Sequence, residues 1–128
     1  MAKVRQLIVS CENRPGSLAH TARVLGDAKV NILGFLTTTF GTDGSVQLVA
    51  DNPNKAKKAL ERAGLSYTEQ AVLQVELPNL PGALASFAGK LAAKEINITS
   101  GYLTAVKGSK KASLLLAVSD LEKAARIR

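Results

Sequence analysis

The chain has 128 residues, 46% of them hydrophobic, and a formal net charge of +7 that is spread evenly over its two halves. It contains no apolar run near the roughly 18 residues of a membrane-spanning helix and no secretory apolar core after its first residues, so we expect a cytoplasmic protein with no membrane partner. A single cysteine, Cys11, excludes an internal disulfide and a CxxC motif.

Two stretches of the chain are nearly identical and lie 66 positions apart: residues 13–19 (NRPGSLA) and residues 79–85 (NLPGALA). The same offset aligns Leu7 with Leu73 and Leu48 with Leu114. The repeat predicts a tandem duplication with one unit at residues 1–70 and a second at residues 71–128. Units this small bury only about 60% of their unfolded surface, which favours further association, such as a homodimer.

The first unit begins with apolar residues that alternate with polar ones up to the turn at Pro15-Gly16, which predicts a strand. From Leu18 the apolar spacing becomes helical and includes Ala22 and Leu25. Residues 31–40 and 46–50 form a predicted hairpin around the turn at 41–44. A second helix is expected from residues 52–54 to Gly64. The predicted order is therefore strand, helix, strand, strand, helix.

Residues 65–77 alternate between apolar and polar, without a turn residue, so the last strand of the first unit is expected to run directly into the first strand of the second. The second unit repeats the same order, and its alignment suggests a one-residue insertion in its hairpin. Its final helix begins near residue 119, and no fourth strand follows. We expect the resulting sheet edge to be covered by another chain or by the other half.

The predicted fold is therefore α+β, with two ferredoxin-like βαββαβ units in tandem. Each has an antiparallel sheet with helices on one face, and the second unit lacks its last strand. Where Pro-Gly joins a strand to a helix, the first amides of that helix have no partner within it. Such amides suit a carboxylate, because the positive end of the helix dipole lies behind them.

This order of elements, with Pro-Gly after the first strand and Val30-Asn31-Ile32 opening the second, resembles the ACT domain, a regulatory module that binds amino acids. Residues 11–18 with 29–32 are similar to the ligand-binding signature of that family, especially in the serine-sensing ACT domain of phosphoglycerate dehydrogenase. Residues 77–84 with 95–98 match at the same places. Cys11 stands where the serine-sensing form has histidine, which leaves the amino acid open.

The resemblance implies a ligand site shared between units, with the loop of one unit and the asparagine of its neighbour in contact with the ligand. Apart from the resemblance, the free amides of Gly16, Ser17 and Leu18, and likewise those of Gly82, Ala83 and Leu84, would hold the carboxylate. The side-chain carbonyls of Asn13 and Asn31, or of Asn79 and Asn97, would accept hydrogen bonds from the ammonium group. The predicted ligand-binding residues are Asn13, Arg14, Pro15, Gly16, Ser17, Leu18, Asn31 and Ile32 and, in the second unit, Asn79, Leu80, Pro81, Gly82, Ala83, Leu84, Asn97 and Ile98.

Other chemistry finds little support in the sequence. We interpret Cys11 as a small buried apolar residue and His20 as a surface residue, because no second histidine completes a metal site. No catalytic triad or phosphate loop of the GxxxxGK type is present, so we predict no enzyme, no cofactor and no metal.

Two other functions are compatible with this topology. A regulatory subunit that binds no ligand could dock on an amino-acid biosynthetic enzyme, as the ACT portion of the acetolactate synthase small subunit suggests. An RNA-binding module of the same topology needs aromatic residues on its two central strands. Those strands carry Leu7, Val9, Val46 and Leu48. We therefore expect no nucleic-acid partner.

Overall fold

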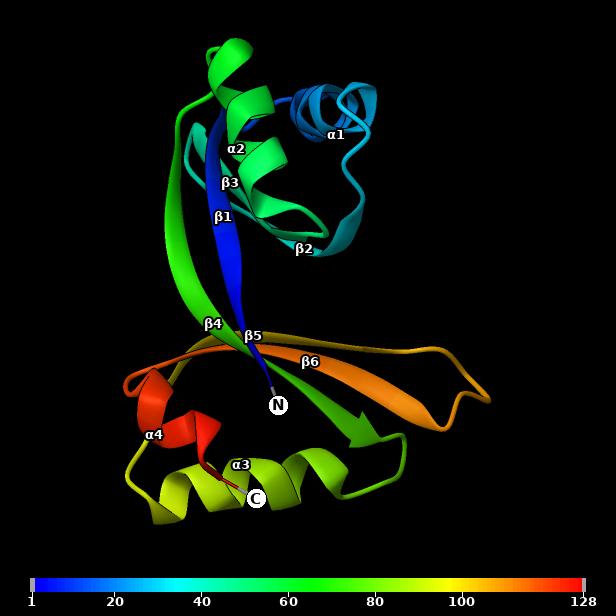
Figure 1. Cartoon of the computed structure of the whole chain (residues 1–128), viewed down its shortest axis with the longest axis vertical. Coiled ribbons are helices and arrows are strands. Elements are labelled where there is room, and N and C mark those ends of the chain that lie inside the picture. The colour runs from blue at the N-terminus through cyan, green and yellow to red at the C-terminus, as the bar shows by residue number, and fades with distance from the viewer. Residues whose placement is uncertain (1, 128) are drawn as a thin grey trace. The chain divides into compact units, whose positions relative to one another are not determined.

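The computed structural model describes residues 2–127, which form two compact units (Figure 1). The N-terminal unit comprises residues 5–70, and the C-terminal unit comprises residues 2–4 together with residues 71–127. In each unit two helices lie on one face of antiparallel strands (Figure 1). The α+β class and the tandem βαββαβ plan are therefore confirmed.

The bounds of the elements follow the predicted order. The first six elements are β1 (Ala2–Glu12), α1 (Ser17–Asp27), β2 (Ile32–Phe40), β3 (Asp43–Ala50), α2 (Pro53–Arg62) and β4 (Tyr67–Pro78). The last four are α3 (Ala83–Ala93), β5 (Ile98–Ala105), β6 (Lys111–Val118) and α4 (Leu121–Ala125). As predicted, one continuous strand, β4, joins the two units without a linker.

The two longest strands, β1 and β4, each contribute residues to both units. Neighbouring strands are hydrogen-bonded in the order β2-β3-β1-β4-β6-β5. The N-terminal unit therefore has the order β2-β3-β1-β4, and the C-terminal unit has the order β1-β4-β6-β5. Residues 2–4 of β1 take the place of the fourth strand that the second unit lacks, so the sheet edge beside β4 is covered by the chain's own first strand.

The strand register corrects one detail of the repeat. Leu7 pairs with Leu48 across β1 and β3, whereas Leu73 pairs with Leu116 across β4 and β6. Leu48 therefore corresponds to Leu116 and not to Leu114, and the second hairpin contains an insertion of two residues instead of one. Side chains in a strand alternate with a period of two, so a shift by two keeps the same face inward and leaves the apolar pattern unchanged.

Each unit has its own hydrophobic core between its helices and its strands. Large apolar side chains repeat at the offsets that the register defines, and Leu7 and Leu73 are both fully buried. The buried N-terminal core is Leu7, Val9, Leu25, Val30, Val46, Leu48, Ala50, Ala56, Ala59 and Leu60. The buried C-terminal core is Leu73, Val75, Leu77, Phe87, Leu91, Ile96, Leu114, Leu116, Ala124 and Ile127. Burial of a leucine in such a core stabilises the fold by about 1.5–3 kcal/mol.

The second helix of each unit starts at a capped residue. Asn52 Oδ1 accepts a hydrogen bond from the Lys55 amide at 3.1 Å, and Asp120 Oδ1 accepts one from the Lys123 amide at 3.0 Å. Pro53 occupies the first position of α2, where its missing N–H costs nothing. These caps satisfy donors that an uncapped helix leaves free.

A strained backbone position follows the first helix of each unit. Lys29 has φ 63° and Glu95 has φ 58°, a left-handed conformation that L-residues with a side chain rarely adopt. The two positions are related by the 66-residue repeat. The turn is fixed because the next residue, Val30 or Ile96, donates its amide back to the helix, to Leu25 O or Leu91 O at 3.0 Å.

Replacing Lys29 with glycine is expected to stabilise the protein by about 0.5–1 kcal/mol, because glycine adopts this conformation without a steric cost. The matched control is Lys58→Gly, in the exposed interior of α2, which should destabilise the protein by about 1 kcal/mol. Urea unfolding measures both. A loss of stability in both variants would contradict the strain assigned to Lys29.

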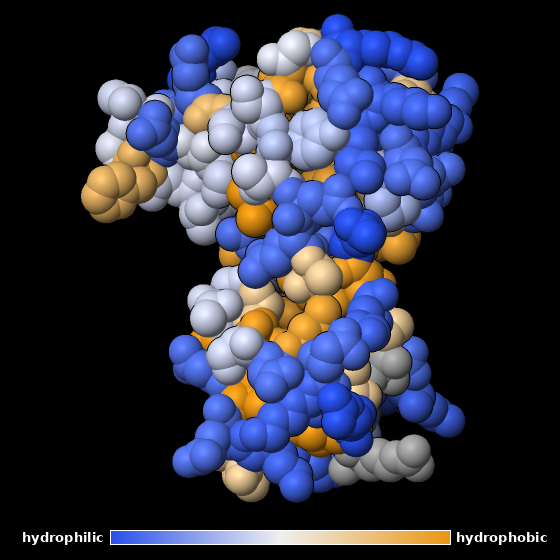
Figure 2. All heavy atoms as spheres, turned by 60° about the vertical axis from the view of Figure 1, so that its left-hand side comes forward, coloured by the Kyte–Doolittle hydropathy of each residue, from blue (hydrophilic) through white to orange (hydrophobic). Residues whose placement is uncertain are grey.

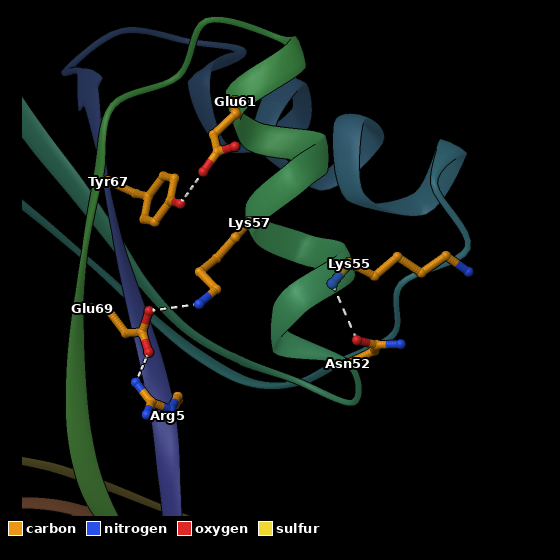
Figure 3. A network of polar contacts seen from close by, with 7 residues as sticks. All are labelled: Arg5, Asn52, Lys55, Lys57, Glu61, Tyr67 and Glu69. Carbon is orange, nitrogen blue, oxygen red and sulfur yellow. Dashed lines mark hydrogen bonds and ion pairs between the residues drawn. The ribbon is translucent and has the colours of Figure 1, made fainter.

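Glu69 lies at the centre of a polar network in the N-terminal unit (Figure 3). Its carboxylate accepts a hydrogen bond from Lys57 Nζ at 3.0 Å and another from the Arg5 guanidinium. These two cations hold the pKa of Glu69 below its ordinary value of 4.5. Nearby, the Tyr67 hydroxyl donates to Glu61 at 2.6 Å, and this bond raises the pKa of Tyr67. The network links β1, α2 and β4.

Because folding lowers the pKa of Glu69, its ion pairs stabilise the fold fully at neutral pH. This contribution is lost as the pH falls below 4.5 and through the folded-state pKa. Wild-type protein should therefore lose more stability between neutral pH and pH about 3 than Glu69→Gln, which has no carboxylate to titrate. Urea unfolding at both pH values tests this, and equal losses would exclude the network as an acid-sensitive element.

Candidate functional site

The first helix of each unit begins at a glycine in the left-handed conformation. Gly16 precedes α1 with φ 92°, and Gly82 precedes α3 with φ 86°. Neither helix has a side-chain cap. The first helical hydrogen bonds run from the His20 amide to Gly16 O and from the Ser86 amide to Gly82 O, both at 2.9 Å. The amides before His20 and Ser86 therefore need partners from outside the helix.

Most of these amides have no hydrogen-bond partner in the described part of the chain. The predicted donor Ser17 is an exception, because its amide donates to Arg14 O at 3.3 Å, and Ala83 likewise donates to Leu80 O at 3.2 Å. The amides without a partner among residues 2–127 are those of Gly16, Leu18, Ala19, Gly82, Leu84 and Ala85. The amides of Ala19 and Ala85 were not predicted as donors, although every amide in the first helical turn lacks a partner within the helix.

The loop before each glycine is tied to the turn of the neighbouring hairpin. Asn13 Nδ2 donates to Gly41 O at 2.9 Å, and the Asn13 amide donates to Thr42 O at 2.9 Å. In the C-terminal unit Asn79 Nδ2 donates to Ser109 O at 2.9 Å. The amide group of each asparagine therefore has a structural role. The described residues make no hydrogen bond to Asn13 Oδ1, which stays free to accept one.

The side chains of the first loop also contact one another. The Ser17 hydroxyl donates to Glu12 O at 2.7 Å. Arg14 Nε lies 2.8 Å from Glu12 Oε2, and both side chains are largely exposed. An exposed ion pair of this kind adds at most about 1 kcal/mol to stability. Both charges therefore remain accessible to a ligand.

A cavity of about 440 Å³ adjoins this loop in the N-terminal unit. Its lining includes three of the predicted site residues, Arg14, Gly16 and Ser17. Cys11, which belongs to the signature-like residues 11–18, also lines it, and so does His20, which was predicted only as a surface residue. Small-molecule pockets usually have volumes of about 300–1,000 Å³, so the cavity has the size that a metabolite requires.

Asn31 and Asn97 lie at the other end of their units. The Asn31 amide donates to Asp51 Oδ1 at 3.0 Å, and the Asn97 amide donates to Ser119 Oγ at 2.9 Å. These bonds fix the start of β2 and of β5. The side chains of both asparagines are exposed and make no hydrogen bond within the described residues.

Within one unit, Asn13 and Asn31 cannot bind the same small ligand. Asn13 is hydrogen-bonded to the hairpin turn that follows β2, whereas Asn31 directly precedes β2. The nine residues of this strand span about 30 Å at 3.3 Å per residue. The structure therefore separates the two groups of predicted site residues, and a site that uses both needs a second unit.

Several apolar residues near the loops are exposed. Leu18 is one of the apolar positions predicted for the first helix, but it is 38% exposed, and the equivalent Leu84 is 47% exposed. Leu25, another of these positions, is buried together with Thr21. Phe35, on the edge strand β2, is also about half exposed. Hydrophilic side chains dominate the face drawn in Figure 2, and hydrophobic areas lie between them.

Other kinds of site find no support in the described residues. His20 is exposed, as predicted, whereas Cys11, predicted to be buried, is only partly buried against the N-terminal core. Among residues 2–127, no group of three or more His, Cys, Asp or Glu side chains could hold a metal ion. Within the same range, none of the helices is both long and apolar enough to cross a membrane.

The family model of the ACT domain pair matches residues 2–127 of the chain. The chain belongs to the ACT domain pair family. The resemblance found in its loops is thereby confirmed over nearly its whole length. Among curated proteins, none matches this chain significantly.

Solved structures share the fold of this ACT pair. A Bacteroides thetaiotaomicron protein is 27% identical, with a TM-score of 0.90, and the match covers 96% of this chain and 84% of that protein. The ligand-free regulatory subunit of aspartate kinase from Thermus thermophilus is 15% identical, with a TM-score of 0.70 and coverage of 98% and 94%. Escherichia coli aspartokinase III, in complex with aspartate and ADP, is 16% identical, with a TM-score of 0.57 and coverage of 95% and 30%.

The tie between Asn13 and the hairpin turn leads to a prediction about loop mobility. Asn13→Ala should speed hydrogen exchange at the hydrogen-bonded amides of Arg14 and Ser17 by about fivefold to tenfold, because a hydrogen bond of about 1 kcal/mol that holds the loop is lost. The control is Asn31→Ala, whose side chain makes no bond to this loop. Exchange measured by mass spectrometry should be unchanged there. Equal exchange in wild type and Asn13→Ala would exclude the tie.

Proposed function

We propose that the protein is a non-catalytic regulatory protein that senses a small amino acid or a related metabolite. The uncapped amides at the two glycine elbows, Gly16 and Gly82, are the observation that carries this proposal. They recur at equivalent places in both units, and the chain belongs to a family of paired ACT domains. The ligand's carboxylate would bind these amides in place of the missing side-chain cap.

The energetics favour an anion at these amides. The amides of Gly16 and Leu18 lie at the positive end of the α1 dipole, which stabilises a nearby negative charge by about 0.3–1 kcal/mol when exposed. Charge-assisted hydrogen bonds add about 1.5–3 kcal/mol each. Glycine at position 16 also lets a ligand approach the backbone closely, because no Cβ lies in the way.

The same loop offers acceptors for an ammonium group. Asn13 Oδ1 is free, and the Glu12 carboxylate lies beside Arg14 at the cavity. A zwitterion would match this arrangement, with its carboxylate near the amides and Arg14 and its ammonium group near Glu12. A ligand with a carboxylate and no amine would leave Glu12 without such a partner.

We propose that the complete site also needs an asparagine from a second copy of the chain. In an edge-to-edge antiparallel pairing of β2 with another β2, the end of one strand lies beside the start of the other. Asn31 of one copy would then approach the loop of its neighbour. The exposed apolar residues Leu18 and Phe35 favour such an association, because pairing would remove them from water.

Docking on a biosynthetic enzyme is a second candidate function. Phe40, beside the β2–β3 turn, is 88% exposed, and Val106, in the β5–β6 turn, is 73% exposed. Large apolar side chains at turns are suited to insertion into a partner's pocket. Co-purification with an enzyme, without thermal stabilisation by any amino acid, would favour this role over ligand sensing.

A thermal-shift screen against the twenty amino acids, followed by calorimetry, tests the sensing function. At least one amino acid should raise the melting temperature by mass action. Asn31→Ala should then weaken its binding by about 1–3 kcal/mol, because a polar group of the ligand loses its partner. Asn54→Ala, an exposed position on α2, is the matched control and should bind like wild type.

Two further outcomes locate the ligand. Weaker binding in Arg14→Ala, with normal binding in Asn31→Ala, would place the ligand in the cavity of a single unit and contradict the shared site. An absence of thermal shifts and of calorimetric heats for all twenty amino acids would contradict amino-acid sensing itself.

A further inference from the structure

A second cavity, of about 500 Å³, lies in the C-terminal unit between the ends of α3 and α4. We call it the basic cavity. Four cationic side chains and two apolar ones line it: Lys90, Lys94, Lys123, Arg126, Ala93 and Ile127. Lys90 and Lys94 lie at the C-terminal end of α3 and share one face of that helix, because they are four residues apart. Lys123 and Arg126, three apart, likewise share a face of the C-terminal segment.

The charge of the basic cavity is not neutralised within the described residues. None of its four cations makes an ion pair there, and no acidic side chain lines it. Glu122, next to Lys123, is paired with Lys3 at 2.8 Å instead. The negative end of the α3 dipole amounts to about half an elementary charge, which does not balance four cations. Gathering these charges therefore costs stability unless an anion binds.

The equivalent surface of the N-terminal unit differs. With the 66-residue offset, Val24 corresponds to Lys90 and Ala28 corresponds to Lys94. The helix caps Asn52 and Asp120 align α2 with α4, so Lys55 and Lys58 correspond to Lys123 and Arg126. Two cations thus stand where the C-terminal unit has four. If the fold itself required a cationic cluster here, both units would have it.

We propose that the basic cavity binds an organic polyphosphate of the size of a nucleoside diphosphate. Two phosphate groups can each contact more than one cation, and the planar guanidinium of Arg126 can bind a phosphate with two parallel hydrogen bonds. The exposed Ala93, with the small accessible part of Ile127, provides an apolar surface for the rest of the ligand. The cavity has six lining residues, whereas an interface with a protein needs about 20–30 on each side.

Calorimetric titration with ADP and, separately, with inorganic pyrophosphate tests this site at physiological ionic strength. Wild-type protein should bind both, and ADP more tightly, because of the apolar surface. The double variant Lys90→Gln/Lys94→Gln should bind ADP at least about tenfold more weakly. The matched control is Lys55→Gln/Lys58→Gln, which removes the same net charge from the N-terminal unit and should change the affinity by less than about twofold.

Four outcomes would overturn the proposal. The first is that wild-type protein binds neither ADP nor pyrophosphate. The second is an equal loss of affinity in the two double variants, because attraction would then depend on net charge alone. The third is that adenosine binds as well as ADP. The fourth is that single-stranded RNA binds through Lys90 and Lys94 more tightly than ADP does. All four substituted lysines are exposed, so each variant should fold, and circular dichroism checks this.

Discussion

Backbone hydrogen bonding between the two long strands, β1 and β4, is the interaction on which the fold depends. The sheet has six strands, yet each unit contains four, because β1 and β4 each contribute residues to both units. The Ser10 amide, for example, donates to Ser66 O at 2.9 Å just before β4 begins. Without this pairing the C-terminal unit would have an open edge beside β4, and an open edge invites aggregation.

Duplication gave both units the same core and the same glycine elbow, but their surfaces have diverged. Gly16 and Gly82 have nearly the same φ, and Lys29 and Glu95 are strained alike, because backbone geometry at these turns is needed for each unit to close. The loops differ in polarity, with Arg14 in one and Leu80 in the other. A repeated fold can thus carry two sites of different chemistry.

The sequence predicted the elements well because strong local signals mark them. Pro-Gly turns, the Asn52 cap and alternating apolar residues all agree with the structure. The insertion in the second hairpin was predicted one residue too short, because apolar alternation does not distinguish Leu114 from Leu116. The exposure of Leu18 was not predicted, because helical spacing identifies the apolar face of a helix but not which turns of that face pack against the core.

The candidate site was predicted as a set of residues but not as an arrangement in space. Motif spacing could not show that Asn13 is tied to Gly41 or that β2 separates Asn13 from Asn31.

Because both units use β1, the second unit cannot be encoded by one continuous stretch of the gene. A gene fragment that encodes residues 71–127 alone would lack residues 2–4 and therefore one strand of its sheet. A recombination event that moves the second unit without residues 2–4 would therefore leave the edge of β4 unpaired.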